Sequence, residues 1–182
     1  ELFLLGVSWG GFESLALPSS ILPEVAVVDW RLTRSLPPRI TAETGLDALS
    51  QAIESLWCIH STEESMSYSV AALELALDNL ETAVHAPIDA ARAGMSRAAH
   101  LTGKAINITK TTAPHAISYK ISYDFGVAHG HAVALTLGPI LAFNAGVTES
   151  DVTDPRGVEH VRRVIDLILL KLGCKEATSG RA

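Results

Sequence analysis

The chain has 182 residues, of which 48% are hydrophobic and 19% charged, a composition that excludes intrinsic disorder and predicts a packed core. Its net charge of −6 and the absence of a basic cluster argue against binding to nucleic acid or to an anionic membrane. Cys58 and Cys174 stand far apart, which excludes a zinc ribbon or disulfide framework and favours a reducing, cytoplasmic location. The apolar runs are shorter than the roughly 18 residues of a membrane-spanning helix.

The first 40 residues mix short apolar runs with glycine and proline. Residues 1–20 predict a short strand, a turn at Gly10-Gly11 and a second short segment. The apolar run from Val25 to Val28, followed by two prolines, indicates a buried extended piece and then a turn. We interpret residues 21–40 as a connector into a helical part of the chain.

Residues 41–105 carry apolar side chains at three- and four-residue steps, which is the period of an amphipathic helix. At least three helices fit in this stretch. One break is expected at residues 60–64, where Ser61 or Thr62 would cap the second helix. Another is expected at residues 86–88, where Pro87 would open a third helix that ends near residue 102.

The last third of the chain predicts three more helices separated by glycine and proline. Residues 115–123 form a candidate helix after Pro114, and Gly126 and Gly130 bracket a turn. Residues 131–144 are apolar enough for a fully buried helix, bent at Gly138-Pro139. An amphipathic helix is expected over residues 157–172. The fold class that follows is mainly α.

Two spacings in these helices carry a weak chemical signal. Asp47 and Gln51 lie one helical turn apart, so their side chains share a face, but an exposed surface pair would look the same. His115 and His129 fall in glycine-bearing segments, and Gly130 permits a close backbone approach beside the second histidine. The other histidines are interpreted as structural. None of these residues identifies a metal site by itself.

Longer motifs around these residues resemble a known family. Residues 44–54 (TGLDALSQAIE) resemble the start of the helical domain of the iron-dependent, or group III, alcohol dehydrogenases. The residues before them resemble that family's interdomain connector, and residues 128–132 (AHGHA) resemble its PHG signature. The resemblance covers about residues 22–173. It implies a helical bundle of the type shared by dehydroquinate synthase-like proteins and the C-terminal half of these dehydrogenases, after a short extended N-terminal segment.

The same resemblance implies that Asp47, Gln51, His115 and His129 bind a divalent metal, Fe²⁺ or Zn²⁺. Gln51 replaces the commoner histidine, and a neutral amide oxygen should hold these metals less tightly than an imidazole does. Tyr119 stands where many members carry a further histidine, so that histidine's proton-relay role does not transfer. The implied activity is hydride exchange between NAD(P) and an alcohol or aldehyde whose oxygen the metal polarises.

Gln51 together with residues 110–115 (KTTAPH) most resembles the branch of phosphonoacetaldehyde reductases, hydroxyethylphosphonate dehydrogenases and sugar-acid oxidases. These enzymes act on small substrates that carry an anionic group. We therefore expect Lys110, with the hydroxyls of Thr111 and Thr112, to face that anion, although a solvated loop lysine is an equally good interpretation.

The sequence lacks the glycine-rich phosphate loop of a nucleotide-binding domain. In the family that domain would precede Leu22, and the last family helices also lack a counterpart after Gly173. The opening at Glu1 suggests a fragment, and we expect it to be inactive without the cofactor domain. Residues 1–20 instead resemble a segment of cystathionine β-lyase-type pyridoxal-phosphate enzymes. We therefore divide the chain into residues 1–21, which we interpret as a fusion seam, and a truncated helical metal-binding domain over residues 22–182.

Three interpretations remain open from the sequence. The first is the metal-binding part of an NAD(P)-dependent alcohol dehydrogenase that acts on a small molecule and assembles as a homodimer. The second is a non-catalytic remnant whose ligands are vestigial. The third is a lyase-related protein, which predicts a yellow pyridoxal absorbance. Stoichiometric metal separates the first from the second.

Overall fold

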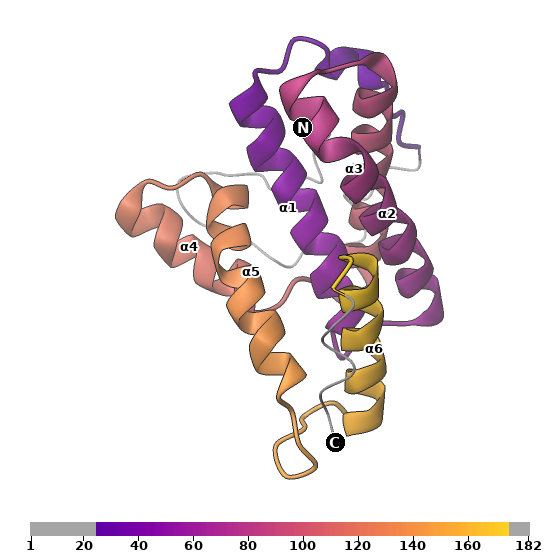
Figure 1. Cartoon of the computed structure of the whole chain (residues 1–182), viewed down its shortest axis with the longest axis vertical. Coiled ribbons are helices and arrows are strands. Elements are labelled where there is room, and N and C mark those ends of the chain that lie inside the picture. The colour runs from indigo at the N-terminus through magenta and orange to yellow at the C-terminus, as the bar shows by residue number, and fades with distance from the viewer. Residues whose placement is uncertain (1–24, 175–182) are drawn as a thin grey trace.

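The computed structural model describes residues 25–174, which form six α-helices and one short 3-10 helix, η2, with no strand among them (Figure 1). The elements in chain order are η2 (Trp30–Thr33), α1 (Pro38–Trp57), α2 (Glu63–His85), α3 (Asp89–Thr109), α4 (Ala113–Phe125), α5 (His129–Ala145) and α6 (Val158–Lys171). The predicted mainly α class is confirmed. The strand and turn expected in residues 1–20, and the proposed boundary after residue 21, lie outside the described residues.

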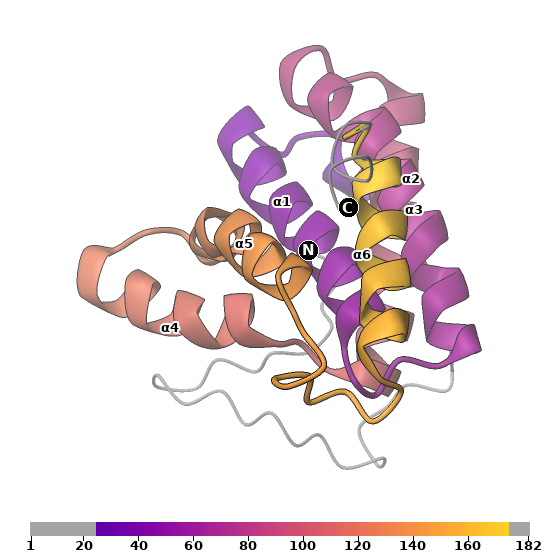
Figure 2. The same cartoon turned by 60° about the horizontal axis from the view of Figure 1, so that its bottom comes forward.

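Helix α1 is the centre of the bundle. Helices α2 and α3 pack against it on one side, and the pair α4–α5 lies on the other, with α6 completing the bundle against α1 and α5 (Figures 1 and 2). Because α1 touches both halves, side chains along one of its faces can meet residues from α4 and α5.

The core lies where α1, α2, α5 and α6 meet. Its large side chains are completely or almost completely buried: Ile53, Leu56, Leu73, Ile165 and Ile168. Burial of each such side chain stabilises the fold by about 1.5–3 kcal/mol. The stripe on α6 that supplies two of them is the one that its sequence periodicity predicts.

Several predicted helix ends are confirmed. Thr62 is the N-cap of α2, where its hydroxyl accepts a hydrogen bond from the Ser65 amide and the Ser65 hydroxyl accepts one from the Thr62 amide. Helix α6 begins at Val158, one residue after its expected start. Helix α4 begins at Ala113, two residues before its expected start, and includes Pro114 in its first turn. The turn expected at Gly130 is wrong, because α5 already begins at His129. Helix α3 begins after Pro87, at Asp89, but continues to Thr109, past the expected end near residue 102.

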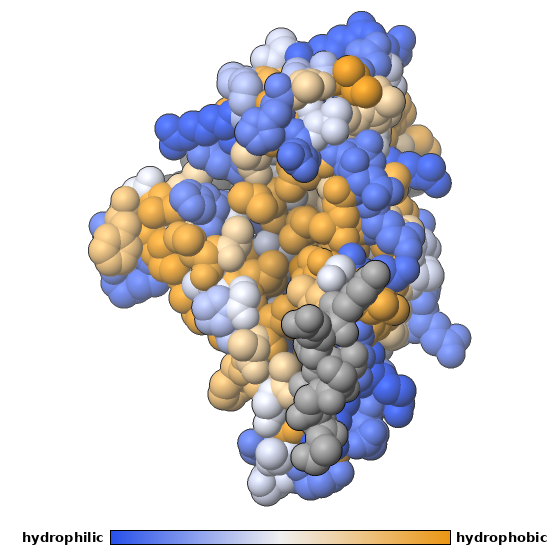
Figure 3. Space-filling model, in the orientation of Figure 1, coloured by the Kyte–Doolittle hydropathy of each residue, from blue (hydrophilic) through white to orange (hydrophobic). Residues whose placement is uncertain are grey.

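Two burial predictions are wrong. Val25 and Val27 are exposed, because no described element packs over this end of the connector. Helix α5 is buried only along the face of Ala132, Val133 and Leu137, while residues such as Phe143 on its other face are exposed. Its apolar side chains therefore form part of the molecular surface, where Figure 3 shows apolar residues gathered over α4, α5 and the adjoining part of α1.

The loop before α6 is tied to the loop between α1 and α2 by one guanidinium group. Arg156 donates to the backbone carbonyls of Ser61 (3.0 Å) and Cys58 (2.9 Å) and pairs with Asp154 (2.7 Å).

Among the described residues, no helix combines the length and apolar character needed to cross a lipid bilayer.

Candidate metal centre

Helix α1 aligns three polar side chains toward α4. Asp47, Gln51 and Glu54 are spaced by four and then three residues, so they lie on one face over two helical turns. Asp47 and Gln51 are partly exposed, whereas the Glu54 side chain is completely buried. The face therefore runs from a half-open end at Asp47 into the interior.

His115 enters this face from the first turn of α4. Pro114 fits that turn because its missing N–H would have no partner inside the helix. The His115 side chain is 5% exposed. Its Nε2 atom lies 3.2 Å from Asp47 Oδ1, and its Nδ1 atom contacts Glu54 Oε2 on the opposite edge of the ring.

His129 is the first residue of α5, and a glycine follows it. A Cβ on Gly130 would lie 1.9 Å from the Glu43 carbonyl oxygen and 3.0 Å from Asp47 Cβ, so the close approach predicted for this glycine is confirmed. The approach brings His129 Nε2 to 3.6 Å from Asp47 Oδ1. One carboxylate oxygen of α1 thus faces one imidazole from each of α4 and α5.

Asp47, His115 and His129 form a three-residue cluster whose ligand-type atoms all lie within 4.8 Å of one another. Two nitrogen or oxygen ligands that share a tetrahedral Zn²⁺ ion at about 2.1 Å lie about 3.4 Å apart. The two distances from Asp47 Oδ1, 3.2 and 3.6 Å, bracket that value. A set of one carboxylate and two imidazoles fits Zn²⁺ or Fe²⁺ in chemistry and in spacing.

Gln51, the fourth residue implied as a ligand, lies beside Asp47. Its Nε2 atom donates a hydrogen bond of 2.9 Å to Asp47 Oδ2, the oxygen that does not face the histidines. In this arrangement the amide orients the Asp47 carboxylate. Ligation through the Gln51 carbonyl oxygen stays a prediction.

The environment of His115 favours its protonated form in the metal-free protein. Burial alone would lower the pKa of the His115 imidazole, but the hydrogen bonds and negative charges of Asp47 and Glu54 outweigh it and raise the pKa to about 9. Two carboxylates converging on a buried imidazole form a site that attracts positive charge. A bound divalent cation would replace the proton on Nε2.

Glu54 is a site residue that the sequence motif contained but that we did not single out. It follows Asp47 by seven residues, or two helical turns, and this spacing could have placed it on the same face. Its neighbour Ile53 belongs to the apolar core, so the glutamate occurs in a buried stretch of α1. A charged residue inside a buried stretch is rarely found without a partner, and this was the sequence signal that could have identified Glu54.

The hypothesis that residues 110–112 face a substrate anion does not hold for the Thr112 hydroxyl. The Thr112 hydroxyl donates to Glu54 Oε1 (2.8 Å) and accepts from Trp57 Nε1 (2.8 Å), so it is engaged inside the protein. Lys110 is exposed and has a positive φ of 69° at the end of α3.

Tyr119 borders the cluster. Its ring stacks on that of His129, with ring centroids 5.7 Å apart.

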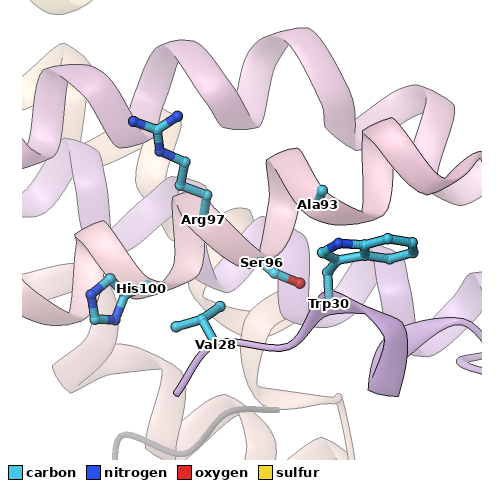
Figure 4. Close-up of a pocket in the computed structure, with 6 residues that line it drawn as sticks. All are labelled: Val28, Trp30, Ala93, Ser96, Arg97 and His100. Carbon is cyan, nitrogen blue, oxygen red and sulfur yellow. The ribbon is translucent and has the colours of Figure 1, made fainter. Parts of the chain in front are cut away.

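A shallow hollow of about 260 Å³ lies elsewhere, between the connector and α3 (Figure 4). Trp30 and Val28 line one wall, and Arg97 and His100 of α3 lie at the other side. It shares no residue with the three-residue cluster and has no carboxylate in its lining. The chemistry expected of a metal centre is therefore confined, within residues 25–174, to the cluster on α1, α4 and α5.

Residues 41–179 match the family described as the Fe-containing alcohol dehydrogenase family, C-terminal. The chain is 43% identical over 154 residues to phosphonoacetaldehyde reductase of Streptomyces viridochromogenes, a match that covers 84% of this chain and 39% of that protein. It is 36% identical over 124 residues to long-chain-alcohol dehydrogenase 1 of Geobacillus thermodenitrificans, covering 68% of this chain and 31% of that one.

A similar solved structure is that of sulfoacetaldehyde reductase from Bifidobacterium kashiwanohense in complex with NAD⁺. It is 35% identical with a TM-score of 0.67, and the match covers 83% of this chain and 42% of that one. The matches thus span 31–42% of the length of these relatives. The similarity bears out the resemblance on which the four implied ligands were chosen; the ligand set itself stays a prediction.

Proposed function

The chain belongs to the Fe-containing alcohol dehydrogenase family, and from this premise we propose that it is the metal-binding helical part of an NAD(P)-dependent alcohol dehydrogenase or aldehyde reductase. The observation that carries the proposal is the meeting of Asp47, His115 and His129 from three helices. Asp47, Gln51, His115 and His129 are the proposed ligands. A bound Fe²⁺ or Zn²⁺ ion would supply Lewis-acid polarisation of a substrate oxygen.

The side chains set the charge and shape of the proposed site. Asp47 is the one anionic member of the proposed ligand set, so a divalent ion and its ligands together keep a net positive charge, which the Glu54 carboxylate behind His115 balances. The partial exposure of Asp47 and His129, 25% and 39%, leaves one side open to a small molecule. The buried His115 closes the other side, and Tyr119 borders the opening through its stacking on His129.

We further propose that the substrate is a small alcohol or aldehyde with an anionic group. Two relatives support this class by name, since phosphonoacetaldehyde and sulfoacetaldehyde are both small anionic aldehydes. We propose that the exposed Lys110 binds the anionic group of the substrate, because its ammonium group makes only a long, 3.4 Å contact with the Asn107 carbonyl oxygen. In the enzyme completed with its cofactor domain, Lys110→Ala should raise KM for the anionic aldehyde and leave KM for a neutral one unchanged.

Cofactor binding needs more than the described residues supply. The described helices contain no glycine-rich turn between a strand and a helix, the context in which dinucleotide phosphates are bound. We therefore propose that NAD(P) binds productively only when a nucleotide-binding domain accompanies this one. Hydride transfer is then a property of the combined domains.

Metal content is the test of the proposal. The 182-residue chain would be stripped with a chelator, reloaded with Zn²⁺ or Fe²⁺, desalted and measured by elemental analysis. We expect close to one ion per chain, lost in the double variant His115→Ala/His129→Ala. His131→Ala is the matched control, because His131 is an exposed histidine in the same motif and lies outside the cluster.

The alternative, a non-catalytic remnant, predicts the opposite result. A chain that is folded by circular dichroism and holds no metal after reloading would overturn the proposed function and support the remnant. Equal metal in the wild type and in the double variant would show that the ion binds elsewhere, and would also overturn it.

A further inference from the structure

We propose that Glu54 is a positioning residue that fixes the tautomer of His115, with the proton on Nδ1 and the Nε2 lone pair directed at the metal centre. The inference rests on the proposed metal site and concerns a residue outside its ligand set. It follows from the hydrogen bonds of one completely buried carboxylate.

A buried carboxylate is costly unless it is fully hydrogen-bonded. Glu54 Oε1 accepts from the Thr112 amide and from the Thr112 hydroxyl, both at 2.8 Å. Glu54 Oε2 contacts Nδ1 of the His115 ring. The carboxylate also lies at the N-terminus of α4, where the helix dipole favours a negative charge.

The contact between Glu54 and His115 determines which ring nitrogen keeps its proton once His115 is neutral. An ionised carboxylate can only accept hydrogen bonds, so Nδ1 of His115 must be the donor. In a neutral imidazole the other nitrogen, Nε2, then has the free lone pair. Nε2 is the atom that lies 3.2 Å from Asp47 Oδ1, inside the cluster. Glu54 therefore selects the tautomer that a metal ligand needs.

The carboxylate is itself held in place from behind. Trp57 Nε1 donates to the Thr112 hydroxyl (2.8 Å), which leaves the hydroxyl proton for Glu54. Trp57 is the last residue of α1, and Thr112 precedes α4, so the chain of hydrogen bonds also ties the two helices together. This arrangement fixes the rotamer of Glu54 and, through it, the plane of the His115 ring.

Glu54→Gln tests the role with almost no change in volume. With its amide oxygen toward Thr112, the glutamine would present its NH₂ group to His115 Nδ1 and favour the tautomer with the proton on Nε2. With the amide reversed, the NH₂ group would face the Thr112 amide and leave two donors opposed. The first orientation disfavours the tautomer that can ligate a metal, and the second keeps that tautomer only at the cost of the opposed donors. We therefore expect Zn²⁺ to bind about 10–100-fold more weakly.

The experiment measures the Zn²⁺ dissociation constant of the 182-residue chain by competition with a chromophoric chelator. Asp154→Asn is the matched control, since it also neutralises a buried carboxylate but in the loop before α6. The control should leave Zn²⁺ affinity unchanged. In the Zn²⁺-loaded protein, ¹⁵N NMR of the histidine side chains should show His115 protonated on Nδ1 and ligating through Nε2 in the wild type, and His115 released from the metal in part of the Glu54→Gln molecules.

The outcomes separate this inference from the proposed function. A wild-type chain without Zn²⁺ affinity overturns both. Wild-type binding that Glu54→Gln leaves unchanged, with the same His115 tautomer, overturns the role of Glu54 alone. If Glu54→Gln does not fold, Thr112→Val decides, because it removes one donor to Glu54: a several-fold loss of Zn²⁺ affinity supports the role, and an unchanged affinity overturns it.

Discussion

Gly130 of α5 lies so close to the Glu43 carbonyl oxygen of α1 that a Cβ added to it would be 1.9 Å from that oxygen. The neighbouring atom is backbone, so it cannot rotate away as a side chain does. The approach fixes the distance between α1 and α5 at the point where Asp47 and His129 face each other. The glycine is therefore a requirement of the site as well as of helix packing.

Gly130→Ala should separate the two helices and weaken both the fold and the site. The added methyl group must displace α5, and overpacking of this kind costs about 1–3 kcal/mol. His129 moves with α5, so metal binding should fall as well. Urea unfolding followed by circular dichroism gives the first quantity, and chelator competition gives the second.

Gly138→Ala is the matched control for this prediction. It lies in the same helix, and nothing is within 4 Å of where its Cβ would be. The free energy of unfolding should change by less than about 1 kcal/mol, and metal binding should not change. If Gly130→Ala behaved in the same way as Gly138→Ala, the close packing of α1 and α5 would not control the site.

The sequence allowed much of the cluster to be anticipated, but not its interior. Asp47, His115 and His129 lie in motifs long enough to resemble a family, and the structure brings them together. Glu54 lies in one of the same motifs, yet its role depends on the residue opposite it on α4, 61 positions away in sequence. A helical period shows which residues share a face and says nothing of what that face meets.

The limits of the fold prediction have a similar physical origin. Helix α6 was expected over residues 157–172 and occupies Val158–Lys171. The prediction succeeds because the apolar stripe and the glycines on either side of the helix indicate the same two ends. Helix α3 extends seven residues past its expected end because Ala105 and Thr109 are buried, which outweighs the low helix propensity of the residues around them. The predicted burial of Val25 is wrong, because an apolar run does not specify which part of the protein packs against it.

Gln51→His should strengthen the binding of Zn²⁺. Gln51 lies one turn from Asp47 on the face of the cluster, and an imidazole is a better ligand for Zn²⁺ than an amide oxygen. We expect at least about a tenfold gain in affinity, which corresponds to about 1.4 kcal/mol. Isothermal titration of the stripped chain with Zn²⁺ measures it.

A histidine placed elsewhere serves as the comparison for this variant. Asp78→His puts it at an exposed position of α2, outside the cluster, and should leave the affinity unchanged. An equal gain in both variants would mean that the added histidine binds Zn²⁺ without the cluster. No gain from Gln51→His would remove position 51 from the proposed ligand set.

Asp154→Asn should destabilise the fold in a pH-dependent manner. The hydrogen bonds from Arg156 hold the pKa of Asp154 below its ordinary value of 3.8, against the effect of burial, and the charge of His160 acts in the same direction as Arg156. The carboxylate therefore stabilises the fold above pH 3.8, and this contribution is lost as the pH falls through the folded pKa. At pH 7 the variant should lose about 1.5–3 kcal/mol of unfolding free energy.

Urea unfolding of the wild type and of Asp154→Asn at several pH values checks this prediction. The difference between the two proteins should be constant from neutral pH to about pH 5 and should narrow in more acid solution. Arg156→Lys should also be less stable, since a lysine cannot bind Asp154, Ser61 and Cys58 together. A difference that does not vary with pH would show that the carboxylate acts by shape and not by charge.

The exposed apolar side chains of α4 and α5 should make the chain self-associate. Phe125 and Phe143 are 77% and 78% exposed, on elements that contribute to the apolar surface in Figure 3. Surfaces of this kind in other proteins mark contacts with a partner or lead to aggregation. We expect sedimentation velocity to show dimers or larger species across the micromolar range.

The double variant Phe125→Ser/Phe143→Ser should shift these species toward monomer. It should change the unfolding free energy by less than about 0.5 kcal/mol, since both rings are already in solvent. The contrasting variant Leu73→Ser should unfold the protein, because Leu73 is completely buried in the core. A wild-type chain that is monomeric at every concentration would contradict the prediction and the homodimer expected for the family.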